Sequence, residues 1–175
     1  MTSPLQKNIA DFLQLTGLHG PNFKGTPERV ARAWQAFLGQ ELFDITSFQL
    51  ERKGGTILIK NHECWSFCPH HLLPVRYIVK VGYIPNKQKV LGLSKLARIV
   101  NAQMSKMPLQ EDLAAMIAQP IIDSINPKGV GVIINGEHLC MRMRGVESTH
   151  AEAVSTFFWG VHLDDDTARK EFMLL

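Results

Sequence analysis

One short stretch of the chain concentrates side chains that could bind a metal. In "SFCPHHLLP", Cys68 and His71 are separated only by Pro69 and His70. A Cys-x-x-His pair on a tight turn can aim a thiolate and an imidazole at one point, and both groups are zinc ligands. Taken alone, the pair is explained equally well as polar residues at a turn.

A second stretch, "EHLCMRMRG", supplies the groups that such a site would still need. In an extended strand alternate residues face the same side, so His138, Cys140, Arg142 and Arg144 are expected on one face. An imidazole, a thiol and two cations would make a poor core face. They suit one wall of a site for an anion beside a metal.

Combined, the two stretches predict three metal ligands, Cys68, His71 and Cys140. Three protein ligands are typical of catalytic zinc sites, which keep a position for water. His70 and His138 would remain as imidazoles that do not bind the metal. Their ordinary pKa range suits general acid–base catalysis.

Two further stretches could contact a nucleotide, although each has a simpler explanation. In "GLSKLARIV", Ser94, Lys95 and Arg98 cluster at a predicted helix start, which suits phosphate, although taken alone the stretch is better explained as a capped surface helix with solvated charges. In "LQEDL", Glu111 could accept paired N–H groups from a guanine-type ring, or could simply favour the helix start. Cys64 is predicted to be a buried core thiol.

Composition narrows the class of protein. The chain has 175 residues, 45% of them hydrophobic and 20% charged, which fits one domain with a substantial core. The net charge of +3 does not suggest a nucleic-acid partner, but it suits a small anionic ligand. Three cysteines without framework spacing argue against disulfides. With neither a membrane-length apolar run nor a signal-peptide pattern, we expect a cytoplasmic protein.

Hydrophobic periodicity predicts the elements that must position these residues. Helices are expected over 5–18 and 26–38 (with Thr26 as N-cap), over 92–104 (capped by Ser94), and over 109–125, kinked or split at Pro120. Strands are expected over 56–68, 75–85, 130–146 and 151–160. We therefore predict an N-terminal helical region at 1–50 and a domain at 51–175. The domain should be α+β, a four-stranded antiparallel sheet with two helices on one face, and its open edges favour assembly.

From about Leu5 to the C-terminus, the sequence resembles the GTP cyclohydrolase I family. The stretches that carry the resemblance are "GTPERVARAW", "CPHHLLP", "GYIPN", "GLSKLARIV", "QE", "NPKGVGV", "HLCMRMRGV" and "VST". The resemblance implies a tunnelling fold (T-fold) that assembles into an oligomeric β-barrel. It also implies a homodecamer of two stacked pentameric rings with active sites between subunits.

The resemblance also implies a role for each matching position. Zn²⁺ would be held by Cys68, His71 and Cys140, with His70 and His138 as the catalytic histidines. Glu111, with Gln110 beside it, would grip the purine ring. The implied triphosphate contacts are Ser94, Lys95, Arg98, Arg144 and Arg29. Zinc-activated water would attack C8 of GTP while His70 protonates N7. Formate would then leave, and an Amadori rearrangement would lead to 7,8-dihydroneopterin triphosphate.

Some positions depart from the family pattern. Pro69 stands where the family usually has Glu, Asp112 follows the "QE" pair, and Glu147 and Glu152 follow "MRGV". One alternative is therefore a diverged paralogue that stops at purine ring opening or uses another purine nucleotide. A non-catalytic zinc-stabilised oligomer is a second alternative, but it would not need the two extra histidines. A nitrile reductase of the same broad fold would need a nucleophilic cysteine motif that the sequence does not show.

Overall fold

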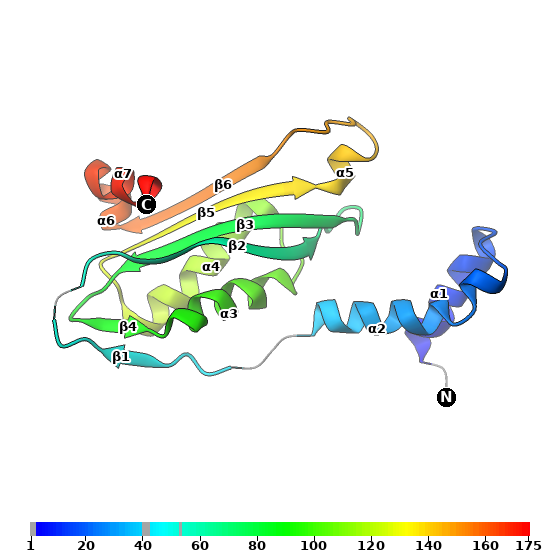
Figure 1. Cartoon of the computed structure of the whole chain (residues 1–175), viewed down its shortest axis with the longest axis horizontal. Coiled ribbons are helices and arrows are strands. Elements are labelled where there is room, and N and C mark those ends of the chain that lie inside the picture. Colours follow the sequence, from blue (N-terminus) through cyan, green and yellow to red (C-terminus); the bar gives the residue numbers. More distant parts are fainter. Residues whose placement is uncertain (1–2, 40–42, 53) are drawn as a thin grey trace. The chain divides into compact units, whose positions relative to one another are not determined.

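A computed structural model describes residues 3–39, 43–52 and 54–175 (Figure 1). The chain divides into two compact units, residues 1–40 and residues 41–175. Among the described residues no helix combines the length and the apolar composition needed to cross a membrane.

The first unit is a pair of helices joined by a short 3-10 turn. Helix α1 spans Pro4–Leu15, the turn η1 spans Pro21–Phe23, and helix α2 spans Thr26–Leu38. The prediction that Thr26 is the N-cap is wrong by one residue. Gly25 holds that position with φ of 74°, a conformation that glycine adopts without strain. Large apolar side chains such as Phe12 and Leu15 stay exposed in this unit.

The second unit is built on a four-stranded antiparallel sheet, as predicted. Its strands are β2 (Ile57–Phe67), β3 (Pro74–Ile84), β5 (Gly129–His138) and β6 (Ala153–Gly160), in the order β2-β3-β5-β6. The α+β class is therefore confirmed. A small second sheet pairs β1 (Ser47–Gln49) with β4 (Lys89–Leu91). The segment at 47–49 thus pairs with β4 in the second unit, although the sequence pattern groups it with the N-terminal helices.

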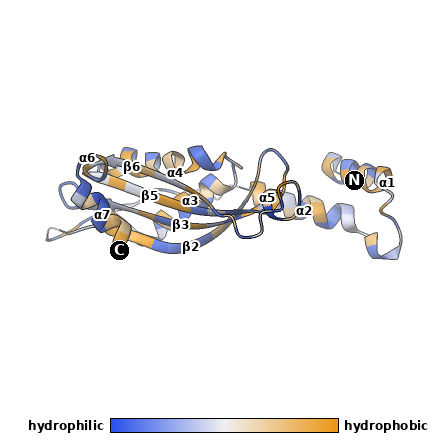
Figure 2. Cartoon of the chain, turned by 90° about the horizontal axis from the view of Figure 1, so that it is seen from above, coloured by the Kyte–Doolittle hydropathy of each residue, from blue (hydrophilic) through white to orange (hydrophobic). Residues whose placement is uncertain are grey.

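Two helices cover one face of the large sheet, also as predicted (Figure 1). They are α3 (Leu93–Met104) and α4 (Gln110–Ile125). Alternate residues of β3 point into the core beneath them and are almost fully buried: Val75, Tyr77, Val79, Val81 and Tyr83. Figure 2 shows hydrophobic and hydrophilic residues interspersed along the strands and helices.

Two predictions about these helices need correction. Ser94 is not a cap: α3 begins at Leu93 after Gly92, and no side chain caps it with a hydrogen bond. Pro120 does not split α4, which is a single helix from residue 110 to residue 125. Burial of Ile117 and Ile121 in the core on either side of the proline outweighs the cost of its missing N–H.

The C-terminal segment covers part of the other face. Helices α6 (Val161–Asp164) and α7 (Asp166–Leu174) follow β6 directly. Phe172 of α7 is fully buried, and its ring lies where a side chain on Gly131 of β5 would project. The chain end therefore packs on the sheet instead of fraying from it.

Strand β5 is shorter than predicted, and this change matters for the site. It ends at His138, and Leu139–Arg142 then form a single helical turn, α5. The predicted common strand face for His138, Cys140, Arg142 and Arg144 is therefore wrong. Arg142 turns back to Glu137, and Arg144 is exposed.

Candidate active site

The loop between β2 and β3 is folded tightly enough to present two of the predicted ligands. The N–H of Cys68 donates to the carbonyl of Leu73 at 2.9 Å, while the N–H groups of His71 and Leu72 donate to the carbonyl of Cys68 at 3.3 and 2.8 Å. Pro69 occupies the second position of this turn, which proline favours. It removes no hydrogen bond, because the N–H groups used belong to residues 68, 71 and 72.

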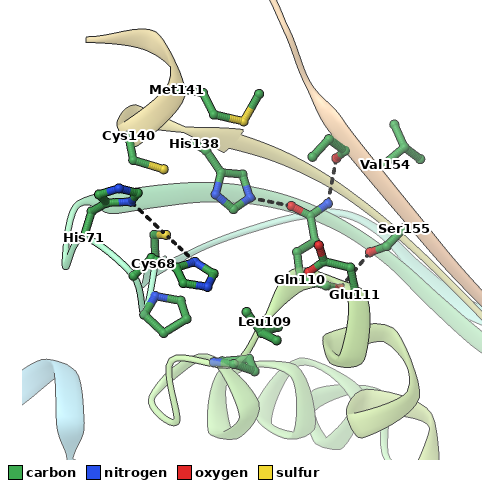
Figure 3. Close-up of a pocket in the computed structure, with 14 residues that line it drawn as sticks. Cys68, His71, Leu109, Gln110, Glu111, His138, Cys140, Met141, Val154 and Ser155 are labelled. Atoms are coloured by element: carbon green, nitrogen blue, oxygen red, sulfur yellow. Dashed lines mark hydrogen bonds between the residues drawn. The ribbon is translucent and has the colours of Figure 1, made fainter. Parts of the chain in front are cut away.

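The helical turn α5 brings Cys140 to the same place (Figure 3). Ligand atoms of Cys68, His138 and Cys140 all lie within 4.8 Å of one another. The Nδ1 atoms of His70 and His71 lie 3.7 and 3.8 Å from the Cys68 sulfur. The predicted pairing of Cys68 with Cys140 is thus present, with three imidazoles around it.

This donor set suits a thiophilic divalent cation such as zinc. Cys68 is buried, and Cys140 is half-buried. The pKa of the Cys140 thiol is raised, first by burial and then by the neighbouring Cys68, with Arg144 acting in the opposite direction. A cation between the sulfurs would relieve the repulsion that opposes two adjacent thiolates. Either His71 or His138 could complete the set with the two cysteines.

Gln110, at the start of α4, holds His138 in place. Its side-chain N–H donates to the carbonyl of Ala153 at 2.7 Å, and its Oε1 lies 2.6 Å from Nε2 of His138. A carbonyl can only accept, so the amide nitrogen must face Ala153, and the amide oxygen must face the imidazole. His138 Nε2 is therefore the protonated nitrogen, which leaves Nδ1 with a free lone pair in the neutral ring.

Close packing explains why Gln110 can reach His138. Gln110 is only 6% exposed, and a side chain on Gly136 would overlap its Oε1. The Tyr77 ring meets His138 edge-on at 6.0 Å between centroids. Burial lowers the pKa of His138, and Glu111 partly offsets this effect. Burial therefore favours the neutral form of the imidazole.

A cavity of about 340 Å³ opens beside these groups. Cys68, His70, His71, Glu111, His138 and Cys140 line it, together with Gln110, apolar residues just before α4 and apolar residues of β6. The predicted metal, imidazole and carboxylate groups therefore converge on one space. The sequence reasoning did not single out Met141 or Ser155, which also line the cavity. Ser155 belongs to the "VST" stretch, which was the available signal.

The predicted phosphate contacts of the second unit are not among the residues that line this cavity. Ser94 and Arg98 are exposed on α3, and the Lys95 ammonium lies 5.6 Å from the centroid of the Phe43 ring. Arg144 is exposed beyond α5. Arg29 belongs to the other unit, where its guanidinium donates to the carbonyl of Lys24 and to Thr26 Oγ1.

Cys64 is the buried core thiol that the sequence predicts. It is 7% exposed in β2, and burial raises its pKa to about 12. It does not line the cavity described above.

Comparison with known proteins identifies the family of the chain. The sequence model of the GTP cyclohydrolase I family matches residues 5–175. GTP cyclohydrolase 1 of Thermoanaerobacter pseudethanolicus is 39% identical over 178 residues, covering 98% of this chain and 94% of the relative. GTP cyclohydrolase 1 of Aquifex aeolicus is 45% identical over 155 residues, covering 87% and 83%. By these matches the chain belongs to the GTP cyclohydrolase I family.

Proposed function

We propose that this chain is a GTP cyclohydrolase I, a hydrolase that converts GTP to formate and 7,8-dihydroneopterin triphosphate. The observation that carries the proposal is the convergence of Cys68, Cys140, three histidines and Glu111 around one cavity of about 340 Å³. The family match over residues 5–175 gives this constellation its chemical context.

A divalent ion, zinc by preference, would be held by Cys68, His71 and Cys140. Bound there, it would lower the pKa of a coordinated water toward neutrality. We assign the third ligand position to His71, which matches the family's ligand pattern and whose Nδ1 lies 3.8 Å from the Cys68 sulfur. His138, held by Gln110 and Tyr77 in a half-buried position, is assigned to proton transfer. A fixed, neutral imidazole beside the metal suits proton transfer.

The remaining groups of the cavity would orient the purine and move protons. Glu111, at the start of α4, would accept the paired N–H groups of the guanine ring. His70 would protonate N7 as water adds at C8, and His138 would assist the later proton transfers.

The triphosphate would be held by Ser94, Lys95, Arg98, Arg144 and Arg29, with some of these groups supplied by a neighbouring subunit. We propose a T-fold barrel assembled as a homodecamer of two pentameric rings. Strands β2 and β6 end the sheet order and can each pair with another copy. The exposed apolar side chains of α1 favour the same conclusion. Light scattering of the purified chain would measure the assembly.

GTP turnover, followed by formate release and pterin fluorescence in parallel, tests the reaction. Equal yields of both products are expected. Formate without fluorescence would indicate instead an enzyme that stops at ring opening.

Metal content of two variants tests the ligand assignment. His71→Ala should lose the bound metal, whereas His138→Ala should keep it and lose turnover. The opposite pattern would exchange the two roles.

A further inference from the structure

A chain of charged side chains crosses the sheet and ends at the turn that carries Cys140. Arg76 contacts Glu63 at 2.7 Å with one nitrogen and Glu137 at 3.1 Å with the other. The second oxygen of Glu137 lies 3.0 Å from Nη1 of Arg142. This charge ladder (Glu63, Arg76, Glu137, Arg142) thus runs from β2 through β3 and β5 to α5.

The ladder lies on the face of the sheet opposite α3 and α4. Arg76 and Glu137 are direct cross-strand partners in the register, and their neighbours Val75 and Tyr77 point into the core. His138 follows Glu137 and therefore points to the core side. Helix α5 begins where the sheet ends, so its Cys140 meets Cys68, while its Arg142 reaches back to the opposite face.

The end of the charge ladder next to α5, formed by Glu137 and Arg142, is less exposed to solvent than the end at Glu63. The side chain of Glu63 is 47% exposed, whereas those of Glu137 and Arg142 are each 25% exposed. The Nε atom of Arg142 is also buried, with no hydrogen-bond partner among the atoms of the described residues. Removing Glu137 would leave a largely desolvated guanidinium without its counter-charge, so the inner pair resists opening.

Helix α5 needs such an anchor because it is too short to be stable by itself. It has four residues, and a single helical turn is strongly disfavoured in isolation. Its backbone is held by the bonds from Met143 N–H to Leu139 and from Ser148 N–H to Met141. The guanidinium of Arg142 adds the side-chain contact that ties this turn to β5.

We propose that the Glu137–Arg142 ion pair, braced by Arg76, is a positioning device that presets α5 so that the Cys140 sulfur faces Cys68 before a metal binds. The inference rests on the metal site of the proposed function. Arg142 is then a positioning residue, whereas its sequence pattern suggested that it lines a site for an anion. Contacts outside the ligand set commonly change metal affinity by about 10–100-fold.

Titration of the metal-free full chain with Co²⁺ tests the proposal, with thiolate-to-cobalt absorption as the readout. Glu137→Gln and Arg142→Met should weaken Co²⁺ binding about 10–100-fold while reaching the same absorption at saturation. Glu63→Gln is the matched control, since it removes the other partner of Arg76 without touching α5. The Co²⁺ affinity of this control variant should stay within about threefold of that of the unchanged chain. Arg142→Lys, which keeps the charge, should recover part of the affinity.

Hydrogen exchange of the metal-free chain supplies a second readout. The amides of Met143 and Ser148 should exchange faster in Arg142→Met than in Glu63→Gln. Equal Co²⁺ affinities and equal exchange in these two variants would overturn the positioning role. Absence of thiolate absorption from the unchanged chain would overturn the metal site itself, and the positioning role with it.

Discussion

Replacing Gly136 with alanine should damage the site through Gln110. The added methyl group would overlap Gln110 Oε1 and lie 2.8 Å from Cε1 of Tyr77. Gln110 would have to rotate away and lose its bonds to His138 and Ala153. Two buried hydrogen bonds are worth about 2 kcal/mol, and overpacking costs about 1–3 kcal/mol. We expect the free energy of unfolding to fall by roughly 3–5 kcal/mol.

The same change should also lower turnover by more than partial unfolding of the protein would explain. Without Gln110 the His138 ring is no longer fixed, and misplacing a catalytic group by about 1 Å costs about 100-fold in rate. Gly131→Ala is the matched control on the same strand. Its methyl group would meet the Phe172 ring at 2.8 Å, away from the cavity. It should lower the melting temperature and leave kcat, measured well below that temperature, within about twofold of the unchanged chain.

A double-mutant cycle shows whether Gln110 is the cause. Gln110→Ala removes the side chain that the new methyl group would strike, so the double variant with Gly136→Ala should be more stable than the two single effects predict. We expect a coupling energy of about 1–3 kcal/mol from denaturant unfolding. Additivity within about 0.5 kcal/mol, or an equal loss of kcat in Gly131→Ala, would refute the reasoning.

Three further predictions concern a thiol, a buried histidine and the metal. Cys64→Ala should keep GTP turnover within about twofold and lose about 1–2 kcal/mol of stability, measured by urea unfolding, because Cys64 is a core thiol outside the cavity; a large loss of kcat would contradict this. Burial lowers the pKa of His162, so the unfolded chain binds more protons, and stability should fall as pH drops below about 6.5. His162→Leu should flatten this part of the melting-temperature profile, and an unchanged slope would reject the assignment. Removing metal with a chelator should abolish turnover and lower the melting temperature, and added Zn²⁺ should restore both; full activity in metal-free protein would exclude a catalytic metal.

The sequence was sufficient to predict the four-stranded sheet and the two helices that cover it, because the strands are rich in branched and aromatic residues. It failed at the end of β5, where "EHLCMRMRG" alternates like a strand and contains no glycine or proline before Gly145. What stops the strand is the absence of partners. Strand β3 begins at Pro74, and β6 pairs no further than Ala153 opposite Gly136. Residues after His138 therefore turn into α5.

Parts of the candidate site were predictable to different degrees. Cys68 and Cys140 could be paired from their chemistry, since two thiols near histidines are unusual outside metal sites. The hydrogen bond between Gln110 and His138 could not be predicted. It requires that position 136, far from Gln110 in the sequence, has no side chain that would occupy the same space. Lys95 and Arg98 were chosen for their charge, but the path of α3 within one chain does not lead them to the cavity.

Antiparallel pairing explains why the site forms where it does. The end of β2, the start of β3, the end of β5 and the start of β6 all meet at one end of the sheet. The pairing of Val75 with His138 sets how far the Cys68 loop lies from the turn that carries Cys140. A slip of one residue in this register would turn His138 to the opposite face and place Glu137 toward Gln110. The register of β3 with β5 is thus as necessary to the site as the ligands themselves.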